Sequence, residues 1–275
     1  MNAPVNPGVQ AGHAAWIRGR VVALSHARRT PHLGSSLSCV DLLTAAYWGG
    51  LRLDPAQPDD PGRDRLILSK GHAAAALYAA LCRRGYFPEA LLETYCRPGS
   101  ALQEHPGPRC APGVEAATGS LGHGLALGCG MALAAQLREQ PWRVAVILSD
   151  GECNEGTTWE SALFAAAQPL GNLLALVDYN KWQATGRSNE VLALAPLREK
   201  WAAFGWDARA CDGHDLEALN EVFAEPWDPA GAPRLVVCHT IKGRGVSFME
   251  DDNNWHYRIP TADEVAAARQ ELGLS

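Results

Sequence analysis

Three apolar runs divide the chain, at residues 143–150, 173–180 and 234–240. They lack the alternation of apolar and polar residues that marks a half-exposed strand, so we expect them to be buried on both faces. A shorter run at 64–69 predicts a further strand. Segments with helical spacing lie between and around these runs, at 13–29, 39–51, 72–85, 121–139, 157–171, 194–205 and 216–225. This alternation predicts an α/β fold with a mostly parallel sheet and helices on both faces.

Two segments interrupt the pattern. Residues 52–65 form a loop rich in Pro and Asp, and residues 96–116 form a long Gly and Pro segment without regular structure. Long ordered loops in compact domains are usually functional. Three pairs of a hydroxyl residue and an acidic residue predict capping boxes at helix starts: Ser38 with Asp41, Thr157 with Glu160, and Thr261 with Glu264.

Composition narrows the classes of protein. With 275 residues, 47% of them hydrophobic, the chain can build one large core, and we expect one domain over 13–275 after a flexible 1–12. The net charge of −6 is spread along the chain, which argues against nucleic acid and membrane partners. No run is apolar enough to span a membrane, and the N-terminus does not resemble a secretory signal. Eight separated cysteines without a C-x-x-C pair fit a reducing, cytoplasmic compartment.

Asp150 and Asn180 each end a predicted buried strand. Parallel strands deliver their last residues to one edge of the sheet, where ligands bind, so the two side chains are expected to converge. A carboxylate and an amide oxygen suit Mg²⁺ or Ca²⁺, and a backbone carbonyl in 181–183 would add a ligand. An Asp-Gly pair after a strand is also a common turn, and the Asp can cap a helix. These residues alone leave both interpretations open.

Four histidines, each beside Gly, Pro or a predicted helix start, form a second set of candidate residues: His32, His72, His105 and His256. Neutral imidazole both donates and accepts hydrogen bonds and titrates near neutral pH, which suits hydroxyl and carbonyl substrates. For His13, His26, His214 and His239 we keep a structural interpretation. Lys70 and Lys242 are possible partners of a phosphate, although a solvated surface is the usual place of a lysine.

Two further motifs leave alternatives open. The segment 119–130 is rich in Gly, but its G-x-G-x-x-x-G spacing differs from the dinucleotide fingerprint, and a Gly-rich helix start would still bind a diphosphate. Glu155 and Glu160 lie near a helix start, where the helix dipole favours anions. A capping box is sufficient to explain Glu160, but it does not explain Glu155.

Together these motifs resemble the N-terminal, diphosphate-binding half of transketolase. The matching pieces follow the family order over about residues 15 to 272, and they are "TPHLGSSLSCVDLL", "LSKGHAAAALYAAL", "GVEAATGSLGHGLALGCGMALA", "SDGECNEGTTWESALFAA", "VDYNKWQATG", "KWAAFGWDARACDGHD" and "HTIKGRGVSFMEDDNNWHYRIPTADE". The family's thiamine diphosphate signature begins with Gly-Asp-Gly and ends with Asn-Asn. Here Ser149 replaces the first Gly and Tyr179 the first Asn, and both departures spare the ligand positions.

The resemblance implies a role for each matching residue. Metal ligands would be Asp150, Asn180 and the carbonyl of Trp182. Residues at the cofactor would be Ser35, Lys70, His72, Gly119, Ser120, Leu121, Asp150, Gly151, Glu152, Asn180, Lys242 and His256. The sugar would face His32, His105 and His256, and Glu155 and Glu160 would connect active sites across a subunit interface.

Transketolase also needs a glutamate that activates the cofactor, and in this family it belongs to a second, pyrimidine-binding domain. This chain matches only the first domain, so the resemblance implies one subunit of a split enzyme. Its partner would be a C-terminal subunit carrying the catalytic Glu, in a heterotetramer. Two alternatives remain at this stage: a subunit of a thiamine diphosphate-dependent 2-oxo acid decarboxylase or carboligase, and a non-catalytic scaffold.

Overall fold

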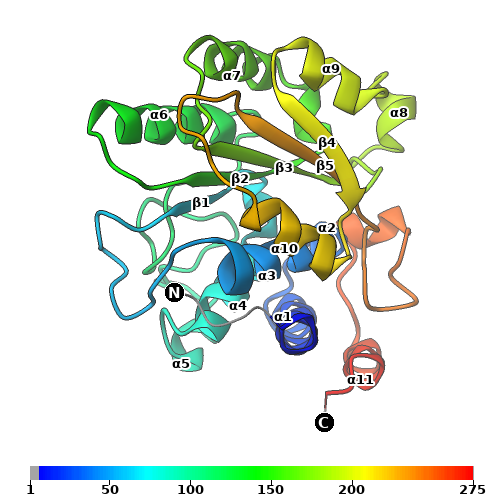
Figure 1. The fold of residues 1–275 in the computed structure, drawn as a ribbon. Helices are drawn as coiled ribbons and strands as arrows, with labels where there is room; N and C mark the ends of the chain where they lie inside the picture. The colour runs from blue at the N-terminus through cyan, green and yellow to red at the C-terminus, as the bar shows by residue number, and fades with distance from the viewer. Residues whose placement is uncertain (1–5, 275) are drawn as a thin grey trace.

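The apolar runs form one parallel sheet at the centre of the computed structural model, which describes residues 6–274 (Figure 1). Its strand order is β1-β2-β3-β5-β4, and all four neighbouring pairs are parallel. The strands are β1 (Arg65–Leu68), β2 (Val144–Ser149), β3 (Leu173–Tyr179), β4 (Asp207–Asp212) and β5 (Arg234–His239). Four of them lie inside the predicted runs, so the predicted α/β class with a parallel sheet is confirmed.

Helices cover both faces of the sheet, and successive residues of each central strand therefore pack into different cores. In β2, Val144, Val146 and Leu148 pack in one core, while Ala145 and Ile147 pack in the other. The first core lies under α6 (Gly124–Leu137), α7 (Gly156–Ala167) and α9 (Leu197–Ala203). The second lies against α1 (Pro7–Arg28), α2 (Leu33–Ser38), α3 (Val40–Ala45), α4 (Ala74–Arg84) and α10 (Leu216–Ala224). The short α5 (Glu89–Leu92) and α8 (Ser188–Val191), with α11 (Ala262–Glu271), complete the α-helices of the described residues.

The sequence pattern missed β4. This strand pairs only with β5, at the edge of the sheet, and most of its residues are partly or fully exposed. Asp207 and Arg209 form an ion pair on its surface. An edge strand has less need of apolar residues than a central one, so no apolar run marks it.

The predicted start of the first helix is wrong, and a short second helix was not predicted. α1 begins at Pro7, with Asn6 as its N-cap, so residues 7–12 are helical, and the remaining part of the expected flexible leader, residues 1–5, lies outside the described residues. The helix expected over 39–51 is present as α3, which starts at Val40 and continues into a π-helical turn at Ala46–Gly50, whereas the short α2, which ends at Ser38, was not predicted. Cys39, with φ −92° and ψ 6°, lies outside helical geometry.

Only one of the three predicted capping boxes forms. Thr261 caps α11, where Glu264 N donates to its hydroxyl at 3.3 Å and Thr261 N donates to Glu264 Oε2 at 2.8 Å. At α7 the N-cap is Glu155, so Thr157 lies inside the first turn. Ser38 ends a helix instead of starting one, and its hydroxyl donates to Asp178.

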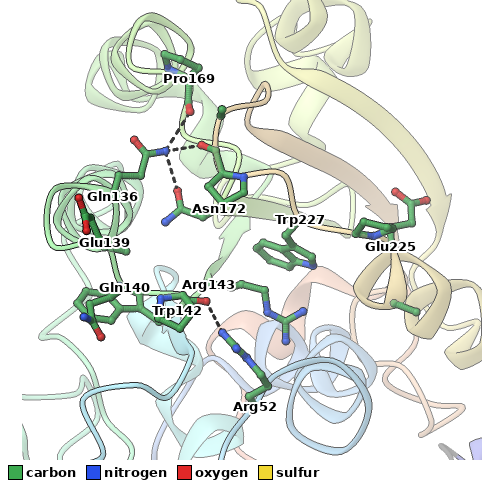
Figure 2. Close-up of a pocket in the computed structure, with 16 residues that line it drawn as sticks. Arg52, Gln136, Glu139, Gln140, Trp142, Arg143, Pro169, Asn172, Glu225 and Trp227 are labelled. Carbon is green, nitrogen blue, oxygen red and sulfur yellow. Dashed lines mark hydrogen bonds between the residues drawn. The ribbon is translucent and has the colours of Figure 1, made fainter. Parts of the chain in front are cut away.

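Hollows lie at both ends of the strands, which we call the carboxyl edge and the amino edge of the sheet. At the carboxyl ends of the strands lies a cleft of about 410 Å³, and at the amino ends of β2 and β3 lies a hollow of about 850 Å³ (Figure 2). Over residues 6–274, no helix combines the length and the apolar character needed to cross a membrane.

Candidate active site

The cleft at the carboxyl edge brings together many of the residues that the sequence predicted. Asp150 and Asn180 follow neighbouring strands, since β2 pairs with β3 in a register that places Ser149 opposite Asp178. Of the predicted site residues, the cleft is lined by His32, Ser35, His72, His105, Gly119, Leu121, Asp150, Gly151, Glu155, Asn180, Trp182 and His256. They come from loops and helix starts far apart in the sequence.

Asp150 is held in place by donors from the segment after Asn180. Its Oδ2 accepts hydrogen bonds from Lys181 N and Ser188 Oγ, both at 2.8 Å, and its Oδ1 accepts one from Gly151 N at 2.8 Å. Asn180 Oδ1 accepts a hydrogen bond from Trp182 N at 3.0 Å. The predicted metal ligands therefore lie in one hydrogen-bonded turn.

The chemistry of this turn fits a divalent cation. Asp150 is 1% exposed, and burial, with a smaller contribution from Asp178, raises the pKa of its carboxyl to about 6. A bound cation would offset that cost of burial. Over residues 6–274, no three His, Cys, Asp or Glu side chains gather as a metal cluster, and the expected set contains only one such side chain, Asp150. The remaining expected ligands are amide and carbonyl oxygens, which suit Mg²⁺ or Ca²⁺.

The four selected histidines form one cluster around His32. The centroid of its ring lies 5.2 Å from that of His72, 6.2 Å from that of His105 and 5.0 Å from that of His256. His32 adopts φ 67° directly before α2, and its N–H donates to the carbonyl of His256 at 2.7 Å. The cluster thus joins the N-terminal segment to the loop before α11.

Burial keeps three of these rings neutral at pH 7. It lowers the pKa of His72 well below its ordinary value, and the charges of Lys70, His32 and His256 lower it further. Burial and Lys242 lower the pKa of His256 to about 3, and burial also lowers the pKa of His32. The sequence alone suggested titration near pH 7, but these lowered pKa values favour the neutral, hydrogen-bonding form of all three rings.

Lys242 lies behind His256. Its ammonium donates to Asn253 Oδ1 at 2.7 Å and to His256 Nδ1 at 3.1 Å, so the proton of the neutral His256 ring is on Nε2. Burial and the charge of Lys70 lower the pKa of Lys242 to about 8. A cation with so few partners is suited to a diphosphate.

The long loop 96–116 delivers His105 to the cleft. Its ring lies so close to Gly119 that a Cβ there would be 2.5 Å from His105 Cδ2, and Gly119 has φ +139°. Only glycine fits both conditions without strain. This contact explains one Gly of the 119–130 segment, and the predicted functional loop reaches the cleft.

Lys70 and Glu152, for which the resemblance implied a place at the cofactor, lie behind the cleft. Lys70 is fully buried, and its ammonium donates to the carbonyl of Ser35 and to Asp178. Glu152 is also fully buried, and it accepts hydrogen bonds from Ser69 Oγ and Gly122 N. Both side chains support the walls of the cleft.

Three other predicted residues lie toward the surface. Glu155 is exposed at the mouth of the cleft, while Ser120 and Glu160 are exposed and do not line it. The four remaining expected structural histidines have other surroundings. His13 stacks on Trp48, His26 bonds to the Pro260 carbonyl, His214 bonds to Asp41, and His239 packs against Tyr179.

Sequence reasoning missed a buried polar network under the site. Asp178 is fully buried, and it joins Lys70, Ser38 and Thr240. The signal was present, because Asp178 is the only charged residue in the apolar run 173–180. A buried carboxylate requires a partner, and Lys70, directly after the apolar run 64–69, was a candidate.

The sequence also did not predict a cluster that fixes the loop after Asn180. Trp182 Nε1 donates to Asp251 at 2.8 Å, and the Arg187 guanidinium lies 3.7 Å from the Trp182 ring centroid. Arg187 also makes a bidentate ion pair with Asp251. These contacts hold the segment that carries the expected carbonyl ligand against the loop before α11.

Comparisons with known proteins agree with this geometry. The profile of the family described as "Transketolase, thiamine diphosphate binding domain" matches residues 12–275. The 6-deoxy-6-sulfo-D-fructose transketolase subunit of Clostridium sp. (strain MSTE9) is 43% identical over 241 residues, 88% of each chain. An apulose-4-phosphate transketolase subunit of Actinobacillus succinogenes is 40% identical over 260 residues, 94% of each chain.

Solved structures give the same result for the fold. Transketolase from Pichia stipitis, in complex with sedoheptulose-7-phosphate, superposes with a TM-score of 0.89 at 29% identity, over 97% of this chain. Transketolase from Leishmania mexicana gives a TM-score of 0.90 at 25% identity, over all of this chain. This chain spans 41% and 42% of those two chains. The predicted resemblance is thus confirmed, and the chain belongs to the transketolase family, in which it corresponds to the thiamine diphosphate binding domain.

Proposed function

We propose that this chain is the diphosphate-binding subunit of a two-component transketolase, which transfers a two-carbon ketol unit from a ketose to an aldose. The observation that carries this proposal is the convergence of four histidines on the cleft that contains Asp150 and Asn180. Thiamine diphosphate, when bound, supplies the carbon that takes up the two-carbon unit.

Asp150, Asn180 and the Trp182 carbonyl would hold Mg²⁺, or Ca²⁺ in its place, with the diphosphate beside it. Lys242 would approach the diphosphate from behind His256, since its ammonium is buried and its pKa is lowered to about 8. The backbone around Gly119 and Leu121 and the side chain of Ser35 would complete the cofactor contacts. Lys70 and Glu152 would act through the residues that they support.

The histidines of the cluster would orient the hydroxyl groups of the donor. A neutral ring donates from one nitrogen and accepts at the other, so it can bind a hydroxyl and exchange a proton with it. His256, whose Nδ1 accepts from Lys242, would donate from Nε2. His32, His72 and His105 surround the same space, and the full set favours a polyhydroxylated substrate over a 2-oxo acid.

The substrate would be a ketose with an anionic group. The two relatives above are named for a sulfonated and a phosphorylated sugar, and the Pichia stipitis enzyme was solved with a sugar phosphate. These names support an anionic donor or acceptor for this chain. Most contacts to the anionic group would come from the partner subunit.

The partner would be a C-terminal subunit with the catalytic Glu, in a heterotetramer. Both relatives are named as subunits and match this chain along most of their length. Apolar side chains exposed on α6 and α7 support a subunit contact there: Leu127, Leu137, Leu163 and Phe164. Glu155 and Glu160, exposed at the start of α7, would join that contact. All eight cysteines are free, which supports the cytoplasm as the compartment.

Calorimetry with thiamine diphosphate and Mg²⁺ tests the proposal, on the chain alone and with its partner subunit. We expect binding that is lost in Asp150→Ala and kept in His239→Asn, a variant of an exposed histidine outside the cleft. Product analysis with a ketose phosphate against pyruvate then separates ketol transfer from decarboxylation. Absence of cofactor binding in both preparations, or unchanged binding by Asp150→Ala, would refute the proposal.

A further inference from the structure

Asp178 is the centre of a buried network that connects four segments under the cleft. Its Oδ2 accepts hydrogen bonds from the ammonium of Lys70, after β1, and from Ser38 Oγ, at the end of α2, at 2.6 Å. Its Oδ1 accepts one from the hydroxyl of Thr240, after β5. Asp178 itself belongs to β3, two residues before Asn180.

The direction of these hydrogen bonds follows from the donors. The Lys70 ammonium can only donate, and three donors converge on the two carboxylate oxygens, so Asp178 acts purely as an acceptor. Ser38 has one hydroxyl proton, and its oxygen lies closer to Asp178, at 2.6 Å, than to the Ser35 carbonyl, at 3.1 Å. That proton is therefore directed to Asp178.

The direction of the Ser38 hydroxyl proton determines how the Asn180 side chain is oriented. Because its proton is directed to Asp178, Ser38 Oγ presents only lone pairs to the Asn180 amide. The distance from Asn180 Nδ2 to Ser38 Oγ is 3.3 Å. A lone pair accepts from the NH₂ end and repels the carbonyl end. The amide is then fixed with Nδ2 toward Ser38 and Oδ1 toward the Trp182 amide in the metal turn.

We propose that Lys70, Asp178 and Ser38 are positioning residues, which orient the Asn180 amide so that its oxygen, and not its nitrogen, faces the metal. This inference rests on the proposed function, because it requires a metal at Asp150 and Asn180. It gives the fully buried Lys70 a role other than phosphate contact. Outer partners of metal ligands typically change metal affinity by about 10- to 100-fold when they are removed.

Ser38→Ala is the decisive variant, since it removes the acceptor of Asn180 Nδ2 with a small change in volume. Ser161→Ala is its matched control, because Ser161 is a buried serine on α7 whose hydroxyl donates to the Thr157 carbonyl at 2.7 Å. We expect Mn²⁺ affinity in the presence of inorganic pyrophosphate, measured by electron paramagnetic resonance, to fall about tenfold in Ser38→Ala only. Thermal unfolding of both variants checks that the loss is not one of folding.

Asp178→Asn tests the carboxylate with a second matched pair. Its control is Asp64→Asn, since Asp64 is also fully buried and paired with cations, at the opposite edge of the sheet. Both variants are expected to lower the unfolding temperature. Only Asp178→Asn is expected to weaken Mn²⁺ binding, because its amide can donate to Ser38 and release the serine proton toward Asn180.

The experiment uses the full chain, alone and with its partner subunit. If wild type binds Mn²⁺ and Ser38→Ala binds it equally well, the positioning role is wrong and the proposed function stands. If wild type binds neither Mn²⁺ nor thiamine diphosphate in either preparation, the proposed function itself fails. If Asp178→Asn does not fold, Ser38→Ala still decides.

Discussion

The carboxyl edge and the amino edge of the sheet differ in ways that indicate where the functional site of this chain lies. The hollow at the amino edge has about twice the volume of the cleft at the carboxyl edge, about 850 Å³ against about 410 Å³. It also contains two tryptophans and two arginines, which are common in binding sites: Trp142, Trp227, Arg52 and Arg143. Volume and residue type alone would favour the amino edge.

At the amino edge, the polar side chains bond to one another. Gln136 Nε2 donates to the Pro169 carbonyl at 3.1 Å, to Asn172 Oδ1 at 3.4 Å and to the Pro229 carbonyl at 2.6 Å (Figure 2). The arginines hold the buried Asp64: Arg52 Nη2 lies 2.8 Å and Arg143 Nη2 2.6 Å from its carboxylate. Among the described residues that line this hollow, no buried side-chain nitrogen or oxygen lacks a partner.

At the carboxyl edge, several buried groups have a shifted pKa or lack a hydrogen-bond partner. The pKa of Asp150 is raised to about 6, that of Lys242 is lowered to about 8, and Gln183 Nε2, in the wall of the cleft, is buried without a partner. Perturbed buried groups of this kind are typical of functional sites, because a ligand completes their interactions. The contacts at the amino edge therefore stabilise the fold, whereas the groups at the carboxyl edge are suited to bind a ligand.

The largest expected effect is that of Asp150→Asn, which removes the charge at the carboxyl edge and keeps the shape. We expect the affinity for thiamine diphosphate with Mg²⁺, measured by calorimetry, to fall about 100-fold or more. The stability of the metal-free chain should instead increase. Because the folded pKa is raised from 3.8 to about 6, ionised Asp150 destabilises the metal-free chain increasingly as pH rises from about 4 to about 6.

Asp150→Asn should therefore stabilise the metal-free chain at pH 7 by up to about 3 kcal/mol, and raise its unfolding temperature. The gain should disappear below about pH 4, where Asp150 is protonated in both states. A lower unfolding temperature at pH 7, measured by calorimetry or circular dichroism, would show that the carboxylate is structural.

The next effect is expected from the histidine cluster. His72→Asn keeps a polar group but cannot donate and accept in the same geometry, so we expect the turnover of ketose by the complex to fall about 10- to 100-fold. The cofactor affinity should change less than the turnover. Equal losses in His239→Asn, the exposed control, would contradict a special role for the cluster.

A smaller, pH-dependent effect is expected from Lys242. The free chain holds the pKa of this ammonium at about 8, and an anionic diphosphate binds its charged form better. Cofactor affinity should thus be constant below about pH 8 and fall as the pH rises above it, by at most about tenfold per unit. Calorimetry at pH 7 and pH 9 measures the change, and Lys242→Met should bind more weakly at pH 7 and lose the dependence.

Much of this site could be predicted from the sequence, for a physical reason. Asp150 and Asn180 end apolar runs that had to be central parallel strands, and the rules of such sheets bring those ends together. The four histidines were selected by their neighbours along the chain. The family resemblance then assigned roles that spacing alone left open between a turn and a metal site.

What the sequence could not provide is the depth of each side chain. Lys70 and Lys242 both follow runs of apolar residues, yet Lys70 is paired with Asp178 behind the cleft while Lys242 reaches His256. That difference depends on which strand ends face each other, and it is not encoded in local spacing. The edge strand β4 was missed for a related reason, because its exposed residues need no apolar pattern.

The smallest effect on function is expected at the amino edge. Gln136→Leu removes the donor that joins the loops before β3 and β5, and should reduce the free energy of unfolding by roughly 1–3 kcal/mol. Its effect on thiamine diphosphate affinity should be within the error of calorimetry, since Gln136 lies at the edge opposite to Asp150. Urea unfolding measures the first quantity. Loss of cofactor binding in a folded Gln136→Leu chain would contradict the division of labour between the two edges, because it would make the larger hollow part of the functional site.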